Sequence, residues 1–253
     1  MRAMVFINEY QQKLNEIYNK EKLICLSDWE LVKFDDKNAL QFISDNCSAV
    51  RNKVNLEGIF DAVADDLISS ISQDIKFSLG NVYLYKELGI NNFLNKYATT
   101  LQGEIIFTYQ QTLGDRRFFF YVSVCFEKLY NFWDRIGYLL FLTLDLKINP
   151  KKIYFPQVIK EIEKSNSQSI NFEFLKKFSE NEYKSILNRT RKMIVHDRQK
   201  DTYFHFAWLK GLNDKEVIEK LQQEKDELPD LLKNQMRLTL DGFKSAILLI
   251  NER

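Results

Sequence analysis

The chain of 253 residues contains 45% hydrophobic and 28% charged residues, which is ordinary for a soluble globular protein. Its 36 basic and 35 acidic residues nearly cancel, which excludes a whole-protein field strong enough to attract nucleic acid. Any site for an anion must therefore be a local cluster of charges. The length allows one large domain or two small ones, and either arrangement can bury a sound core.

The cysteines and the apolar segments exclude several classes of protein. Cys25, Cys47 and Cys125 are odd in number and form no CxxC pair, so neither a disulfide framework nor a zinc knuckle is expected. Met1–Glu9 lacks the apolar core of a signal peptide, and Ile136–Leu144 is too short to span a bilayer. We therefore expect a cytoplasmic protein with no metal, no cofactor and no membrane contact.

The segment before residue 114 is expected to be mostly helical, because eight glycines and three prolines leave few turns. Apolar spacing predicts helices over residues 4–23 and 59–75, and Asp35-Asp36 is a candidate cap for a helix through Val50. Gly80-Asn81 predicts a turn or hairpin, and Asn91-Asn92 is expected to begin a helix that runs to about Leu113. The pattern of residues 24–34 is unclear and leaves a short strand open.

Gly114-Asp115 is the predicted boundary between an N-terminal region, residues 1–113, and a helical bundle, residues 114–253. Glycine suits the end of one helix, and Asp115 can accept hydrogen bonds from the free N–H groups of the next. The helix from Arg116 to about Leu146 is predicted to be the strongest element, with apolar residues around most of its circumference. It is either a central core helix or a core helix that also lines a dimer interface.

Further helices are expected towards the C-terminus, over residues 156–164, 172–178 and 180–195. Residues 201–212 are aromatic and irregular in pattern. Asn213 is a candidate cap for a helix through Lys225, and Pro229 suits the first turn of a final helix that reaches Asn251. The fold class predicted from these elements is all-α, an antiparallel bundle preceded by a mostly helical region with short strands.

A basic cluster with a histidine ends the helix predicted over residues 180–195. It reads Arg191-Lys192-Met193-Ile194-Val195-His196-Asp197-Arg198. Arg191-x4-His196, on a helix that follows a long aromatic one, resembles the RxxxxH signature of HEPN domains. The segment Tyr130–Gly137 in the preceding helix also resembles what HEPN proteins carry there. The resemblance covers roughly Asp115 to Arg253.

This resemblance implies a small helical bundle that dimerises and, in many members, a metal-independent endoribonuclease with Arg191 and His196 at its site. The residue types suit that chemistry, because a neutral histidine can take the 2′-hydroxyl proton and arginine binds phosphate oxygens with a planar fork. Residues five apart lie roughly 140° apart around a regular α-helix. Either the helix therefore ends before His196, or a symmetry mate supplies half the site, in which case a twofold axis beside the motif would join two half-sites into one cleft.

The chain departs from the family pattern at two positions. Lys192 stands where Asn, Asp or His is common, and Arg198 stands where some members carry the tyrosine of a His-x-Tyr extension. Arg189, seven residues before His196, is a reserve candidate for the arginine. These residues and Asp197 are expected to support the site.

Asp134 is a further supporting candidate, because a charge on an otherwise apolar helix needs a partner. Pairing with Arg191 or Arg189 would orient the site arginine, and structural pairing elsewhere is an equal alternative.

Three hypotheses follow for function. The first is a homodimeric HEPN endoribonuclease, as a toxin or phage-defence effector, with a regulatory protein partner left open. The second is a non-catalytic HEPN module that binds RNA, a nucleotide or a protein. The third is a helical scaffold with an accidental motif, because a chain with ten arginines can match the spacing by chance.

Overall fold

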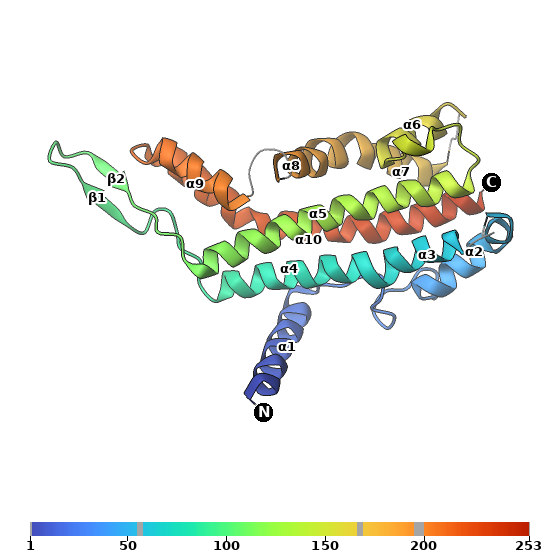
Figure 1. Ribbon diagram of the computed structural model, residues 1–253, viewed down its shortest axis with the longest axis horizontal. Coiled ribbons are helices and arrows are strands. Elements are labelled where there is room, and N and C mark those ends of the chain that lie inside the picture. Colours follow the sequence, from blue (N-terminus) through green and yellow to red (C-terminus); the bar gives the residue numbers. More distant parts are fainter. Residues whose placement is uncertain (1, 55–57, 166–168, 195–199, 253) are drawn as a thin grey trace. The chain divides into compact units, whose positions relative to one another are not determined.

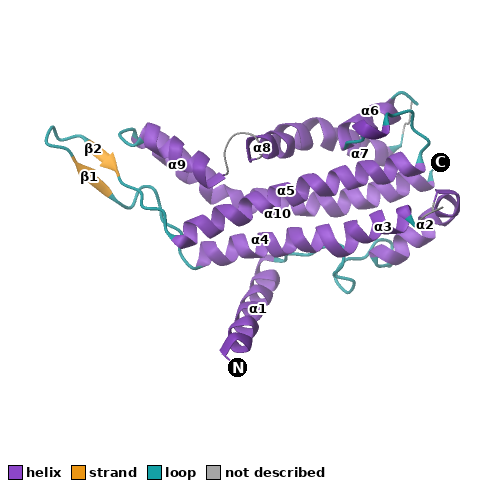
Figure 2. Cartoon of the chain, viewed as in Figure 1, coloured by secondary structure: helices purple, strands orange, loops and turns teal. Residues whose placement is uncertain are grey.

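The computed structural model describes residues 2–54, 58–165, 169–194 and 200–252. The described residues form helices and one two-stranded hairpin (Figures 1 and 2), which confirms the predicted all-α class. Contacts divide the chain into two compact units. Unit 1 contains Met1–Leu23, Phe77–Cys125 and Lys192–Asn234, and unit 2 contains Ile24–Lys76, Phe126–Arg191 and Gln235–Arg253.

Each unit combines segments from both sides of residue 114, and the domain division expected there stays a prediction. None of the helices in the described ranges has the length and apolarity that crossing a membrane requires.

Unit 1 is built from α-helices and the hairpin. Its elements are α1 (Arg2–Glu21), most of α4 (Ser72–Glu87), β1 (Tyr97–Thr99), β2 (Ile105–Phe107), the start of α5 (Leu113–Thr143), α9 (Lys200–Gly211) and the start of α10 (Lys215–Asn251). Aromatic rings fill its core. The ring of Phe204 stacks on Phe119 at 4.9 Å and on Phe93 at 6.1 Å between centroids.

The hairpin replaces the helix expected over residues 91–113. The strands pair antiparallel, with Tyr97 opposite Phe107 and Thr99 opposite Ile105. β-Branched residues favour strands, and Gly103 adopts a φ of 83° in the connecting turn. The hairpin is joined to the end of α9, because the Phe107 N–H donates to the Leu212 carbonyl at 2.8 Å.

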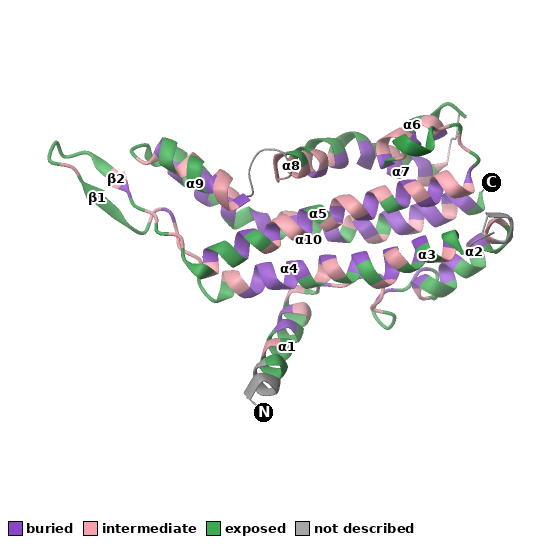
Figure 3. Cartoon of the chain, viewed as in Figure 1, coloured by how far each residue is buried: buried purple, intermediate pink, exposed green. Residues whose placement is uncertain are grey.

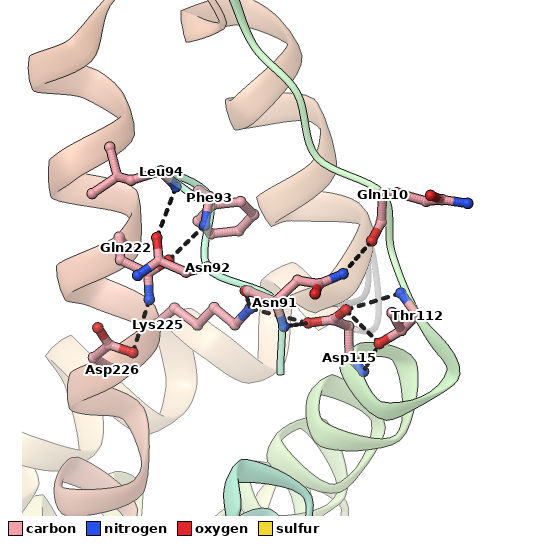
Figure 4. A network of polar contacts seen from close by, with 10 residues as sticks. All are labelled: Asn91, Asn92, Phe93, Leu94, Gln110, Thr112, Asp115, Gln222, Lys225 and Asp226. Carbon is pink, nitrogen blue, oxygen red and sulfur yellow. Dashed lines mark hydrogen bonds and ion pairs between the residues drawn. The ribbon is translucent and has the colours of Figure 1, made fainter. Parts of the chain in front are cut away.

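A buried ion pair ties the hairpin's flanking loops to α10 (Figure 4). The Lys225 ammonium lies 3.1 Å from Asp115 Oδ1 and donates to the Asn91 carbonyl at 2.5 Å, and both charged side chains are fully buried. Asp115 also accepts from the backbone N–H groups of Asn91, at 3.0 Å, and Thr112, at 2.9 Å. The ammonium lies 4.8 Å from the Phe93 ring centroid, so aromatic faces supply further stabilisation.

Asp115 therefore has more contacts than the helix-capping role expected from sequence requires. Thr112 is the residue before α5, and its hydroxyl accepts from the Asp115 N–H at 3.1 Å while Asp115 accepts from the Thr112 N–H. The two residues form a reciprocal capping box. Gly114 lies inside the first turn of α5, so its predicted role as the end of a preceding helix was wrong.

Unit 2 contains the remaining helices. They are α2 (Ala39–Val54), α3 (Ile59–Asp65), the π-helix η1 (Asp66–Ile71), the 3₁₀-helix η2 (Pro150–Lys152), α6 (Phe155–Glu163), α7 (Ile170–Phe178), the π-helix η3 (Ser179–Asn188) and α8 (Arg189–Lys192) up to Arg191, with the rest of α4, α5 and α10. Trp133 of α5 is fully buried at its centre and stacks on Phe178 at 3.6 Å between ring centroids.

Helix α5 matches the strongest element predicted from sequence, and buried residues recur along its length (Figure 3). The apolar residues whose spacing predicts this helix include Phe120, which is 49% exposed, and Tyr130, which is half-buried, whereas nine others are buried. The others are Phe118, Phe119, Val122, Phe126, Leu129, Trp133, Ile136, Leu140 and Leu144. The apolar circumference of α5 is thus largely covered within one chain.

The turn predicted at Gly80-Asn81 was wrong, because both residues lie inside α4. A Cβ at Gly80 would lie 2.4 Å from the Tyr18 ring, so the glycine permits close approach of α1. Asn81 serves as a hydrogen-bonding side chain: it donates to the Phe77 carbonyl at 2.9 Å and accepts from the Tyr10 hydroxyl at 2.6 Å.

Two helix starts also differ from the sequence prediction. Asp35 and Asp36 adopt positive φ values in a turn, and Asn38 caps α2 by accepting from the Gln41 N–H at 2.9 Å. Asp214, rather than Asn213, caps α10 by accepting from the Glu216 N–H at 3.0 Å.

Two segments are more regularly helical than the sequence pattern predicted. Pro229 lies inside α10, which continues through it, so the predicted break before Pro229 was wrong. The irregular pattern of residues 201–212 corresponds to α9.

All three cysteines are buried thiols. Burial raises the pKa of the Cys47 thiol to about 12, and it also raises the pKa of Cys25 and of Cys125. A thiol must lose its proton to react, so these side chains act as small apolar residues of the core.

Candidate functional site

The arginine of the sequence motif lies in α8, a four-residue helix that follows η3 without a break. The Arg191 side chain is half-buried, whereas its neighbours Arg189 and Lys192 are exposed. Arg191 is therefore the member of this basic group whose position the rest of unit 2 constrains.

The ring of Tyr130 supports the Arg191 guanidinium. The central carbon of the guanidinium lies 4.6 Å from the ring centroid, which is a cation–π contact. Arginine favours such stacking because its planar cation is weakly hydrated, and stacking leaves the N–H groups at its edge free to bind an anion. Tyr130 lies on α5, so the long central helix positions the arginine.

Asp134, one turn after Tyr130 on α5, completes the group behind the arginine. Its Oδ1 accepts from the Tyr183 hydroxyl at 2.8 Å and from the Phe155 N–H at 3.2 Å. Burial raises the pKa of Asp134, although these hydrogen bonds and the nearby charge of Arg191 act in the opposite direction. The carboxylate thus contributes negative charge near Arg191, while its close partners are Tyr183 and Phe155.

Two charged residues of α5, Asp134 and Arg135, contact groups other than the site arginines, which is one of the two alternatives that the sequence left open for Asp134. Asp134 has no direct ion pair with Arg191 or Arg189 in the described part of the chain, and Arg135 pairs with Asp66 at 2.7 Å. Both charges thus contribute contacts that stabilise the fold around the site.

Tyr183 is the site residue that the sequence did not single out, because its spacing indicated only a core position. It is buried, and its ring lies 5.2 Å from that of Tyr130. Burial and the neighbouring Asp134 carboxylate raise the pKa of Tyr183, so its hydroxyl stays protonated and donates a hydrogen bond. Burial likewise raises the pKa of Tyr130.

The π-helix η3 determines which residues of this segment face the core. Tyr183 and Leu187 are buried, whereas Ile186, Met193 and Ile194, which α-helical spacing would place on the same face, are only half-buried. A π-helix bonds residue i to i+5 instead of i+4, so a face assigned with the α-helical period drifts away from the core. π-Helical turns occur frequently at functional sites, and η3 leads directly into α8.

Close approach of α6 to α5 depends on Gly137. A Cβ at this position would lie 2.8 Å from the Phe155 Cα and 3.0 Å from its nitrogen, the same N–H that donates to Asp134. Glycine is therefore required here for packing, and the packing aligns one of the donors to the site carboxylate.

Substitution Gly137→Ala is expected to lower the free energy of unfolding by about 1–3 kcal/mol, because the added methyl group must displace backbone. Gly114→Ala is the matched control, since nothing lies closer than 3.5 Å to its Cβ. The control should gain about 0.4–1 kcal/mol through reduced freedom of the unfolded chain. Urea unfolding followed by circular dichroism measures both. Equal effects of the two substitutions would contradict the packing role of Gly137.

The structure brings together Arg191 and Asp134 of the predicted site residues and adds Tyr130 and Tyr183. Arg189 and Lys192 lie exposed in α8 beside Arg191 in the chain. The remaining predicted site residues, His196, Asp197 and Arg198, lie outside the described residues.

Comparison with known proteins identifies a family. Residues 65–251, about three quarters of the chain, match the family model described as HEPN_Cthe2314-like HEPN. The match begins well before Asp115, the start of the resemblance seen in the sequence, and includes every described site residue. No curated protein and no solved structure matches the chain significantly.

Proposed function

Because the chain belongs to the HEPN family, we propose that it is a metal-independent endoribonuclease that acts as a homodimer with a composite Arg/His site. The observation that carries this proposal is the support of Arg191, the residue at the family's arginine position. Its guanidinium lies over Tyr130, near the carboxylate of Asp134, before any substrate arrives. A cation positioned in advance stabilises a transition state better than a mobile one, because no reorganisation is needed during the reaction.

The proposed reaction is an attack of RNA on its own backbone. His196 takes the proton of the 2′-hydroxyl, the 2′-oxygen forms a bond to phosphorus, and the bond from phosphorus to the 5′-oxygen breaks. A second acid returns a proton to that 5′-oxygen, and the products carry a 2′,3′-cyclic phosphate and a free 5′-hydroxyl. Arg191 binds the phosphate oxygens and offsets their growing negative charge.

A homodimer supplies the second acid in this proposal. In the family, two RxxxxH motifs meet at a twofold axis, so the histidine of one copy can act with that of its partner. The apolar surface of α5 does not support dimerisation by itself, because most of it is buried within one chain. The support comes from family membership and from a mechanism that needs both a base and an acid.

The biological setting is part of the same proposal. Within the family such an activity suits a toxin or phage-defence effector in the cytoplasm, where a regulatory protein partner restrains it. Residues before 65 lie outside the family match and are the segment that we propose to contact such a partner. Lys192 and Arg189 extend the positive surface for RNA beside Arg191 in the sequence.

The test uses purified protein and a labelled RNA in the presence of EDTA. The wild type is expected to cut the RNA and leave 2′,3′-cyclic phosphate ends, whereas His196→Ala should be slower by about 10²–10⁴-fold. His205→Ala is the matched control, because it removes the chain's other histidine from an exposed position on α9.

Two results would overturn the proposal. Loss of wild-type cleavage on adding EDTA would contradict the metal-independent mechanism. RNA binding without cleavage under all conditions would favour the alternative, a non-catalytic HEPN module that binds RNA, a nucleotide or a protein.

A further inference from the structure

A cavity of about 420 Å³ lies in unit 2 between η1 and the middle of α5. Its polar lining includes Ser70 from η1 and Asn131, Asp134 and Tyr138 from α5, and Ile153 contributes an apolar wall. The three α5 residues are spaced three and four apart, so they share one face of the helix. Asp134 therefore belongs both to this cavity and to the group that supports Arg191.

Several polar groups of the lining have no hydrogen-bond partner among the described residues. They are the side chains of Ser70, Asn131 and Tyr138. An amide and two hydroxyls can both donate and accept, so together they suit a ligand whose edge alternates donors and acceptors. A concave site with a few convergent polar groups is the usual form of a small-molecule site.

The charged residues of the lining point to an uncharged ligand group. Lys128 pairs with Asp74 at 2.6 Å, and Arg135 pairs with Asp66 at 2.7 Å. Because each of these cations is already paired with a carboxylate, the lining attracts a phosphate less than unpaired cations would. Asp134 remains as an acceptor that favours a donor group on the ligand.

We propose that this cavity binds a nucleobase that carries an exocyclic amine, with adenine as the best fit. The Asn131 amide can pair with the N6 amine and N7 of adenine in the bidentate manner that asparagine uses in nucleic-acid complexes. Asp134 can accept from the amine, and Tyr138 and Ile153 give the lining aromatic and apolar surface for the base. Uracil is disfavoured, because it lacks an exocyclic amine, and its N3–H donor is flanked by two carbonyl oxygens that a carboxylate repels.

The base can come from an RNA strand or from a free nucleotide. In the first case the cavity selects the base near the phosphate at Arg191, and this assignment rests on the proposed endoribonuclease function. In the second case the cavity is a regulatory site that acts on Arg191 through Asp134, Tyr183 and Tyr130. Binding of the base itself depends on neither case.

The test measures binding of adenosine, uridine and a short oligoadenylate to the full chain by isothermal titration calorimetry. Adenosine is expected to bind and uridine to bind at least fivefold more weakly. Asn131→Leu removes the amide at similar volume and should weaken adenosine binding about 5- to 150-fold, the range for a lost bidentate base contact. Tyr138→Phe removes one hydroxyl and provides a second variant with little change in packing. Asn95→Leu, at an exposed loop position, is the matched control.

The outcomes separate this inference from the proposed function. Tighter binding of oligoadenylate than of adenosine, weakened by Asn131→Leu, assigns the base to RNA, whereas equal binding assigns it to a free nucleotide. No nucleoside binding at millimolar concentration, or equal binding of adenosine and uridine, overturns the inference even if RNA is cleaved. Adenosine binding by a protein that never cleaves RNA would support the inference that the cavity binds a nucleobase and would overturn the nuclease proposal.

Discussion

Arg191→Ala is expected to slow RNA cleavage about 10²–10³-fold, the loss seen when one preorganised donor to a developing negative charge is removed. The reason is the position of the guanidinium over Tyr130, which fixes the cation before substrate binds. Single-turnover cleavage of a labelled RNA measures the change. Circular dichroism should show an unchanged fold, because the Arg191 side chain is only half-buried.

Three further arginine substitutions sharpen this prediction. Arg191→Lys keeps the charge but loses the planar fork, so it should recover only part of the activity. Arg237→Ala removes an exposed arginine of α10 and should leave the rate unchanged. If Arg189→Ala abolished cleavage while Arg191→Ala did not, the catalytic arginine would be Arg189 and the support by Tyr130 would have no catalytic meaning.

The second large effect is expected at the buried ion pair of unit 1. Lys225→Met should lower the free energy of unfolding by about 3–5 kcal/mol, because it leaves the Asp115 charge buried without its cation. Burial alone would raise the pKa of Asp115, but hydrogen bonds from Thr112 and the charge of Lys225 outweigh it and hold that pKa below its ordinary value. The carboxylate is therefore charged in the folded protein at neutral pH.

A double-mutant cycle tests the pair directly. Asp115→Asn keeps the side-chain oxygen that accepts hydrogen bonds but removes the charge, so Lys225→Met combined with Asp115→Asn should be more stable than Lys225→Met alone. Lys220→Met, at an exposed position of α10, is the control and should change stability by less than about 0.5 kcal/mol. Additive losses in the cycle would show that the two side chains do not depend on each other.

Helical periodicity was enough to predict the elements that bury a continuous apolar stripe. The helix α5 follows from its aromatic and aliphatic spacing, and the all-α class follows from the scarcity of glycine and proline. In these segments local preference and tertiary burial favour the same structure, so the pattern is reliable.

The sequence predictions were wrong where a tertiary contact determines the local structure. The glycine at Gly80 predicted a turn, but it is a helical residue that allows close approach of the Tyr18 ring. Pro229 predicted a helix break, but it lies inside α10. The hairpin depends on contacts more than a hundred residues away, such as the hydrogen bond from Phe107 to Leu212. A local sequence pattern does not predict contacts between residues so far apart in the chain.

The candidate site was predictable in part. Arg191 and Asp134 were identified by residue type and by resemblance, because a charge on an apolar helix is conspicuous. Tyr183 was not identified, because its spacing indicated only a core position and its hydroxyl partner lies on another element. The support of the arginine by an aromatic ring, instead of by a carboxylate, likewise required the structure.

The burial of all three cysteines makes the native chain suitable for site-selective labelling. With the pKa of Cys47 near 12 and those of the other two thiols raised, almost no thiolate is present at neutral pH to react with a maleimide. A cysteine introduced at the exposed Lys184 would therefore be the reactive one, with no need to remove the others. Spin labels at that position would report the separation of two copies in solution by electron paramagnetic resonance.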